Sequence, residues 1–190
     1  MIFSDHFNRS VSVPFRFVLL ILTIYFSEIL IGIDLGFLGI YPRTVQGLIG
    51  VLTGPLIHGS YFHLISNAVP ILILGAVLFY FYDRVAIKVF LVCYFPTGVL
   101  VWLFAKPSYH IGASGLIYGI AFFLMTFGIF RKDLYSLLIS IIVVFFYGSM
   151  VYGIYPGQPG VSWESHFFGA LMGIVSASYF AKVSKVSSYK

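Results

Sequence analysis

The hydrophobic positions of this chain fall into six long runs that contain few charged residues. The runs cover approximately residues 14–33, 63–82, 85–104, 113–130, 134–152 and 162–182. At about 1.5 Å per helical residue, each run is long enough to cross roughly 30 Å of hydrocarbon. Apolar and polar residues do not alternate within them, which is typical of helices rather than of barrel strands. The pattern predicts an all-α membrane protein with a bundle of six transmembrane helices.

Two connections between the runs differ from the others. Residues 34–62 contain several large apolar side chains, but Gly and Pro interrupt them too often for a span. We expect an interfacial loop with short helices there, between helices 1 and 2. Residues 153–161 are rich in Gly and Pro, and we expect a mobile cover on the same, outer side. Around these loops we expect one six-helix domain at 14–183, with cytoplasmic tails at 1–13 and 184–190.

Composition explains why these runs must meet lipid. The chain of 190 residues is 60% hydrophobic and only 9% charged, whereas soluble domains carry about a quarter charged residues. No small-residue cleavage site follows the first run, so we expect an uncleaved span rather than a signal peptide. The single cysteine, Cys93, excludes an internal disulfide and a cysteine metal cluster.

The basic residues indicate orientation rather than nucleic-acid binding. The net charge is +5, but Lys and Arg lie scattered at the ends of the apolar runs. Nine of them fall on one side of the predicted bundle and two, Arg43 and Lys106, on the other. Because basic residues concentrate in cytoplasmic loops, both termini are predicted to be cytoplasmic. We expect a multi-pass protein of a bacterial inner membrane that has no nucleic-acid partner.

Polar residues gather where three of the predicted helices begin. The second helix opens with "HGSYFHLISNAVP", which contains His58, His63 and Asn67, the fourth with "GASG", which contains Ser114, and the sixth with "SWESHFFGALMG", which contains His166. All three helices start on the outer side, so these groups lie at similar depth. Singly, such residues more often pack or bond their own helix. Together they are the components of a nucleophile, a base and an oxyanion site.

Glycines indicate how the serine and the histidine come together. Two pairs at four-residue spacing follow the polar residues on the fourth and sixth helices: Gly115 and Gly119, and Gly169 and Gly173. Such pairs let two helix backbones approach closely. The Ser114 hydroxyl could then come within hydrogen-bond reach of His166. Tyr118, four residues after Ser114, shares its face and either supports the imidazole or simply packs.

The acidic residues offer no third catalytic member. Glu164, two residues before His166, points to a different helix face, so we expect a Ser–His dyad. There is no pair of aspartates in the apolar runs and no H-E-x-x-H zinc motif. Leu116 replaces the second glycine of the soluble-hydrolase elbow. Glu28 lies near the outer end of the first helix, and we expect it to tie that helix to the interfacial loop.

These motifs resemble the rhomboid intramembrane serine proteases. The resemblance covers helices 2 to 6 and depends on "HGSYFHLISN", "GASG" and "SHFFGALMG" in that order. It implies that Ser114 is the nucleophile and His166 the general base, and that His63, Asn67 and the Ser114 N–H bind the oxyanion. It also implies supporting positions, with His58 as a structural hydrogen-bonder and Tyr118 packed on the catalytic histidine. The supporting positions are His58, Gly112, Gly115, Tyr118 and Gly169.

The same resemblance implies an activity that needs no cofactor and no metal. The substrates would be single-span membrane proteins in the lipid bilayer, cut near the outer end of their helix. Two departures from the family pattern exist. The Trp-Arg pair common in the first loop is absent, so Arg43 in "YPRT" receives no role, and Ser165 stands where alanine often precedes the histidine.

Two other functions stay open from the sequence. One is a non-catalytic rhomboid-like protein that binds membrane helices, although such relatives lack the dyad. The other is a small channel or transporter, which predicts polar groups spread through the membrane's depth rather than gathered in its outer third. The oligomeric state and the physiological substrate are not encoded in any pattern that we find.

Overall fold

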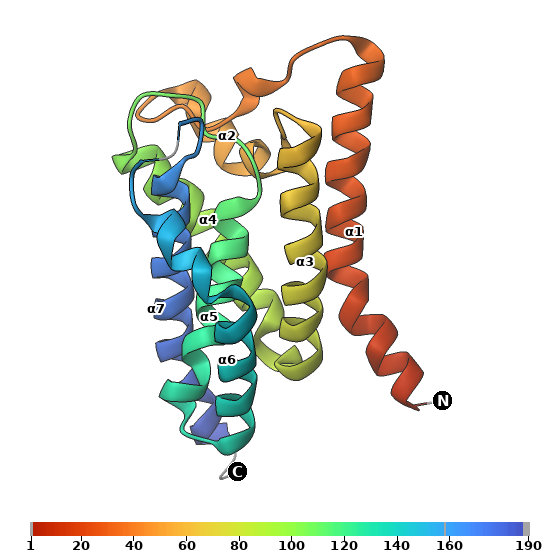
Figure 1. Ribbon diagram of the computed structural model, residues 1–190, viewed down its shortest axis with the longest axis vertical. Helices are drawn as coiled ribbons and strands as arrows, with labels where there is room; N and C mark the ends of the chain where they lie inside the picture. Colours follow the sequence, from red (N-terminus) through yellow and green to blue (C-terminus); the bar gives the residue numbers. More distant parts are fainter. Residues whose placement is uncertain (1, 158, 188–190) are drawn as a thin grey trace.

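The computed structural model describes residues 2–157 and 159–187, and these form a bundle of helices with no strand (Figure 1). Six helices are long and apolar enough to cross a membrane, which confirms the predicted all-α bundle. The long helices are α1 (Ile2–Ile31), α3 (Tyr61–Phe81), α4 (Asp83–Phe104), α5 (Ser114–Arg131), α6 (Leu134–Tyr147) and α7 (Trp163–Ser187). The 3₁₀-helix η3 (Gly148–Ile154) extends the span of α6.

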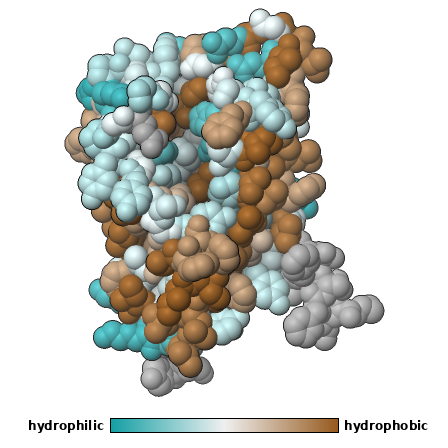
Figure 2. All heavy atoms as spheres, in the orientation of Figure 1, coloured by the Kyte–Doolittle hydropathy of each residue, from teal (hydrophilic) through white to brown (hydrophobic). Residues whose placement is uncertain are grey.

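Helix α5 occupies the centre of the bundle. It packs against α3, α4, α6 and α7, whereas α1 lies at the edge against α3. Of the residues in the α5 span, 67% are buried within the protein, against 17% in the spans of α1 and α6. Figure 2 shows hydrophobic residues over most of the lower part of this face and more polar ones near the top, where the loops lie. The bundle therefore presents an apolar surface to lipid between two ends that carry polar groups.

The terminal helices extend beyond the predicted spans. Helix α1 starts at Ile2 and contains Pro14, the residue at which we expected the first span to begin. Pro14 packs against Gly75 of α3, where a Cβ would lie 2.7 Å from the proline Cβ. The first turns of α1 lean away from α3 in Figure 1, as expected where a proline interrupts the backbone hydrogen bonds. Helix α7 continues to Ser187, and residues 188–190 of the expected tail lie outside the described residues.

The connection between α1 and α3 contains the short helices expected of an interfacial loop. These are η1 (Gly36–Leu38), α2 (Val45–Thr53) and η2 (Gly54–Leu56). The Thr44 hydroxyl caps α2 by accepting from the Gly47 N–H at 3.1 Å. Glu28 Oε1 accepts from the Leu35 N–H at 2.7 Å, which confirms that this carboxylate ties α1 to the loop.

Arg43 and Trp102 join the interfacial loop to the end of α4. The Arg43 guanidinium donates from Nη1 to the carbonyls of Leu103, at 3.2 Å, and Ala105, at 2.9 Å. These carbonyls have no intrahelical donor, so a basic side chain is a favourable cap. In the opposite direction, Trp102 Nε1 donates to the Thr44 carbonyl at 2.8 Å. Arg43 therefore has a structural role, which the sequence alone left open.

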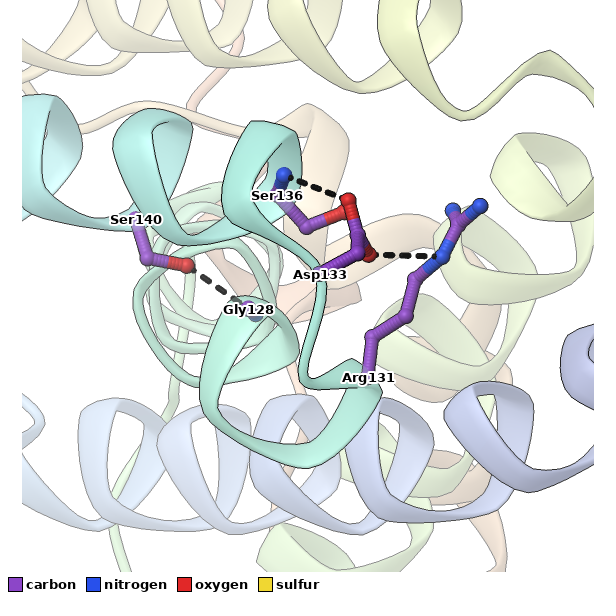
Figure 3. Close-up of polar contacts among 5 residues, drawn as sticks. All are labelled: Gly128, Arg131, Asp133, Ser136 and Ser140. Atoms are coloured by element: carbon purple, nitrogen blue, oxygen red, sulfur yellow. Dashed lines mark hydrogen bonds and ion pairs between the residues drawn. The ribbon is translucent and has the colours of Figure 1, made fainter.

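The turn between α5 and α6 lies at the end of the bundle opposite the interfacial loop (Figure 1), and Figure 3 shows its polar contacts. Asp133 caps α6 by accepting from the Ser136 N–H at 2.9 Å, and its other oxygen pairs with Arg131 at 2.9 Å. The Ser140 hydroxyl accepts from the Gly128 N–H at 3.1 Å and donates to the Leu124 carbonyl at 2.6 Å. Polar contacts thus hold α6 to α5 at the end of the bundle away from the interfacial loop.

Candidate active site

A cavity of about 980 Å³ lies at the end of the bundle where α3, α5 and α7 begin. Its lining includes Ser114, His166, His63 and Asn67, which come from α5, α7 and α3. The sequence placed five residues at similar depth, and the fold brings these four to one cavity, while His58 is not part of its lining. Residues 159–162, at the end of the 153–161 loop, also line it, while Gln158 of that loop lies outside the described residues.

Ser114 is the first residue of α5 and is half-buried at the cavity. The N–H groups in the first turn of a helix have no acceptor within the helix. The positive end of the helix dipole also lies there, which favours a negative charge. The Ser114 hydroxyl and its own N–H therefore occupy a position suited to developing anionic charge.

His166 is held from two sides. Its ring stacks on Tyr118, with ring centroids 4.0 Å apart and planes 5° from parallel. Its Nδ1 lies 3.0 Å from the Gly153 carbonyl oxygen. A carbonyl oxygen only accepts, so Nδ1 carries the proton in this bond and Nε2 of the neutral ring keeps its lone pair. The arrangement gives His166 the tautomer that a general base requires.

Gly153 is the site residue that our reading of the sequence missed. It belongs to η3, in the segment that we expected to be only a cover, and it contributes a backbone carbonyl that any residue possesses. A Cβ at Gly153 would overlap the Tyr118 hydroxyl and lie 3.3 Å from His166 Nδ1. The only sequence signal is the glycine itself, which lies among several others in that loop.

Glycines bring α5 and α7 into backbone contact. A Cβ at Gly169 would overlap the Gly115 carbonyl, and one at Gly173 would overlap the Gly119 carbonyl. The two helices consequently pack with their backbones in direct contact at these glycines. This contact, which we call the α5–α7 seam, sets the distance between the helix that carries Ser114 and the helix that carries His166. No hydrogen bond joins these two side chains within the described residues.

His63 and Asn67 approach the cavity from α3. Gly112, with φ of 99°, lies against the His63 ring, and a Cβ there would overlap Nε2. Glycine is thus required twice at residue 112, for its backbone conformation and for its contact with the imidazole. Asn67, 3% exposed, donates from Nδ2 to the His63 carbonyl at 2.7 Å. Because an amide nitrogen has two hydrogens, one remains for a further acceptor.

His58 does not line the cavity and lies buried behind His63, with ring centroids 5.0 Å apart. The resemblance implies that His58 is a structural hydrogen-bonder. Among the described residues, neither ring nitrogen makes a hydrogen bond of standard geometry, although the Leu56 backbone is close enough to oppose the lowering of the His58 pKa. Burial, together with the neighbouring His63, lowers the pKa of His58 from 6.5 to about 4. The ring is therefore neutral near pH 7, and its burial opposes folding only as the pH falls from about 6.5 toward 4.

The described residues contain no group of three His, Cys, Asp or Glu side chains close enough together to hold a metal ion. What the site offers chemically is one hydroxyl, one oriented imidazole and several N–H donors around a shared cavity. This set of groups is suited to acyl transfer by a serine.

Comparison with known proteins shows the family of this chain. The family model of the Rhomboid domain matches residues 45–183. An uncharacterized protein of Mycobacterium tuberculosis is 35% identical over 170 residues, covering 85% of this chain and 71% of the relative. An uncharacterized protein of Mycobacterium leprae is 34% identical over 148 residues, covering 73% of this chain and 59% of the relative. The chain is an integral multi-pass membrane protein and belongs to the rhomboid family of intramembrane proteases.

Proposed function

We propose that this protein is an intramembrane serine endopeptidase in which Ser114 is the nucleophile and His166 the general base. The observation that carries the proposal is the arrangement of His166, whose Nδ1 is engaged by the Gly153 carbonyl so that Nε2 is the basic nitrogen. Both residues line the same cavity, together with His63 and Asn67. Tyr118, stacked on the imidazole, keeps the ring from rotating.

The reaction follows from these positions. His166 Nε2 takes the hydroxyl proton as Ser114 Oγ attacks the peptide carbonyl carbon, and the carbonyl oxygen becomes an oxyanion. The Ser114 N–H, the free Asn67 amide hydrogen and His63 donate to that oxyanion. The imidazolium then gives its proton to the amide nitrogen, the C–N bond breaks and the amine leaves. A water molecule, activated by the same Nε2, hydrolyses the remaining acyl ester and restores the Ser114 hydroxyl.

The position of the cavity supports single-span membrane proteins as substrates. It opens where α3, α5 and α7 begin, at one end of the membrane-spanning helices. An intact helix hides its carbonyls in hydrogen bonds, so a substrate must unwind before Ser114 can attack. Substrates with Gly or Pro near the cleaved bond should unwind more readily.

The decisive experiment is covalent labelling of the purified protein in detergent. A fluorophosphonate probe should react at Ser114, and the protein should cleave a single-span substrate. Ser114→Ala should abolish both reactions and His166→Ala nearly so, while circular dichroism shows an intact helical bundle. Ser108→Ala, which removes another hydroxyl at the cavity, is the matched control and should leave both unchanged. Cleavage that survives Ser114→Ala would refute the mechanism, and substrate binding without labelling would favour a non-catalytic rhomboid-like protein.

A separate experiment tests the oxyanion site. Asn67 and Ser66 both donate to the His63 carbonyl, so Ser66 provides a matched control for Asn67. Asn67→Ala should lower kcat by roughly 10²–10³ with little change in KM. Ser66→Ala removes a bond to the same carbonyl but no oxyanion donor, so it should have little effect. Equal losses in the two variants would mean that Asn67 only supports the helix.

We also propose that both termini are cytoplasmic and that the cavity opens on the outer side of an inner membrane. The nine-to-two distribution of basic residues supports this orientation. A reporter fused to the C-terminus should be active in the cytoplasm, and one inserted in the loop at 153–161 should be active outside. The reverse pattern would place the cavity at the cytoplasmic face.

A further inference from the structure

Another buried histidine lines the cavity, outside the set of residues assigned above. His110 is 3% exposed and belongs to the segment between α4 and Ser114. Its backbone forms an antiparallel bridge with Ile40 of the interfacial loop, with N–H to carbonyl distances of 2.9 Å in both directions. The two backbone hydrogen bonds thus hold His110 in place independently of its side-chain contacts.

The His110 ring extends from this position to the start of α7. Nδ1 lies 2.6 Å from the Ser162 hydroxyl oxygen. Ser162 in turn lies 2.8 Å from the Ser165 hydroxyl and accepts from the Ser165 N–H at 3.3 Å. Ser162 directly precedes α7 and caps its first turn. His166, the proposed base, is the next residue after Ser165.

The direction of these hydrogen bonds follows from the other ring nitrogen. His110 Nε2 lies 3.0 Å from the Lys106 carbonyl oxygen, which only accepts, so Nε2 carries a proton. Burial lowers the pKa of His110, with opposing contributions from the Lys106 carbonyl and the Glu164 carboxylate and a further lowering by the Lys106 charge. The ring is therefore neutral near pH 7, and Nδ1 is an acceptor. Ser162 must donate its hydroxyl proton to Nδ1, and Ser165 must donate to Ser162.

The geometry points to His110 as a positioning residue for the catalytic pair, acting through Ser162. The inference rests on the proposed function. The segment that contains His110 leads into Ser114, and the cap that it contacts begins the helix of His166. The Ser165 carbonyl also lies close to α5, because a Cβ at Gly115 would be 3.1 Å from it. The His110–Ser162 bond therefore joins the two segments that deliver the nucleophile and the base, beside a longer bond of 3.4 Å from the Lys106 N–H to Glu164 Oε1.

If the His110–Ser162 bond had only a structural role, its loss would lower stability but not the rate of the reaction at Ser114. The α5–α7 seam already fixes the two helices along their length, and Ser162 could cap α7 without His110. The glycine pairs of the seam begin at Gly169, three residues after His166, so the position of the first turn of α7 depends on its other contacts, and the Ser162 cap is one of them. A displacement of about 1 Å between reacting groups can lower a rate by about a hundredfold.

The test compares four variants of the full-length protein in detergent: His110→Ala, Ser162→Ala, the double variant and Ser162→Thr. His110→Ala and Ser162→Ala should each lower kcat, and the rate of fluorophosphonate labelling of Ser114, by about ten- to a hundredfold with KM little changed. The double variant should be no slower than the worse single variant, because both changes break the same link. Ser162→Thr keeps the hydroxyl and should restore the rate. Ser108→Ala, which removes a hydroxyl 3.3 Å from His110 Nε2 without touching α7, is the control.

Each outcome separates this inference from the proposed function. If the unaltered protein is not labelled, the proposed function fails. If it is labelled and the His110→Ala protein, with its melting temperature measured in parallel, keeps the full labelling rate, the positioning role is refuted. Losses that multiply in the double variant would show that His110 and Ser162 act independently, which would also refute it. A lower melting temperature with an unchanged rate would leave His110 a purely structural role.

Discussion

Helices α5 and α6 follow one another in the chain, yet the protein uses them in opposite ways. Both are apolar, and α6 is the more hydrophobic of the two. Nevertheless 67% of the α5 span is buried within the protein and only 17% of the α6 span. Small residues explain the difference, because α5 presents Gly115 and Gly119 to α7 while α6 presents large side chains such as Phe145, which is 81% exposed.

The comparison shows that hydrophobicity does not mark the core of a membrane protein. Lipid is as apolar as a leucine side chain, so apolar surface gains nothing by leaving the bilayer. Close backbone packing and a few hydrogen bonds decide which helix lies inside. The helix that contains Ser114 makes close backbone contacts with α7 at Gly115 and Gly119. The α6 segment reaches the cavity only at its end, where Tyr147 and Met150 line the cavity and the Gly153 carbonyl contacts His166. Three substitutions test this difference.

The largest effect is expected at Gly153, where the α6 segment contacts His166. In Gly153→Ala, the new methyl group would overlap the Tyr118 hydroxyl, so the Tyr118–His166 stack or the Gly153 carbonyl must move. Cleavage should fall by about a hundredfold with KM little changed. Gly148→Ala is the matched control in the same 3₁₀-helix, since its Cβ would only contact Val144 at 3.6 Å. Full activity in Gly153→Ala would mean that the carbonyl does not orient His166.

A smaller effect is expected from widening the α5–α7 seam. In Gly169→Ala the new methyl group would overlap the Gly115 carbonyl, and overpacking of this kind costs about 1–3 kcal/mol. Thermal unfolding in detergent should show this loss, and cleavage should fall about tenfold because Ser114 and His166 move apart. Leu171→Ala, on an exposed face of the same helix, should change neither. A Gly169→Ala protein as stable as the unaltered one would show that the seam is loose.

The smallest effect is expected where α6 is held to α5. Ser140→Ala removes the hydroxyl that accepts from Gly128 and donates to Leu124. The cost should be about 1 kcal/mol of stability, as for other single hydrogen bonds. The labelling rate of Ser114 should stay the same, because this contact lies at the end of the bundle away from the cavity. If the labelling rate of the Ser140→Ala protein fell as far as that of the Gly169→Ala protein, the α5–α6 contact would matter as much for the site as the α5–α7 seam.

The bounds of the spans show how far the apolar pattern reaches. Six runs predict six helices because the bilayer fixes both their length and their character. The candidate spans Ser10–Ile31 and Trp163–Val183 lie within a few residues of the predicted 14–33 and 162–182, while the helices themselves continue further, α1 from Ile2 and α7 to Ser187. Apolar residues are required only within the bilayer, so the hydropathy pattern marks the span. A helix can continue into water as long as its backbone hydrogen bonds are satisfied.

For the site, the sequence by itself determined which side chains lie at the same depth. Ser114, His63, Asn67 and His166 follow from their positions at the starts of helices, and the glycine spacing indicates which helices approach closely. Only the tertiary structure decided which atoms complete the arrangement. The Gly153 carbonyl and the link from His110 to Ser162 join segments far apart in the chain. A backbone carbonyl has no residue type of its own, and a histidine's hydrogen bonds depend on what the fold places beside each ring nitrogen.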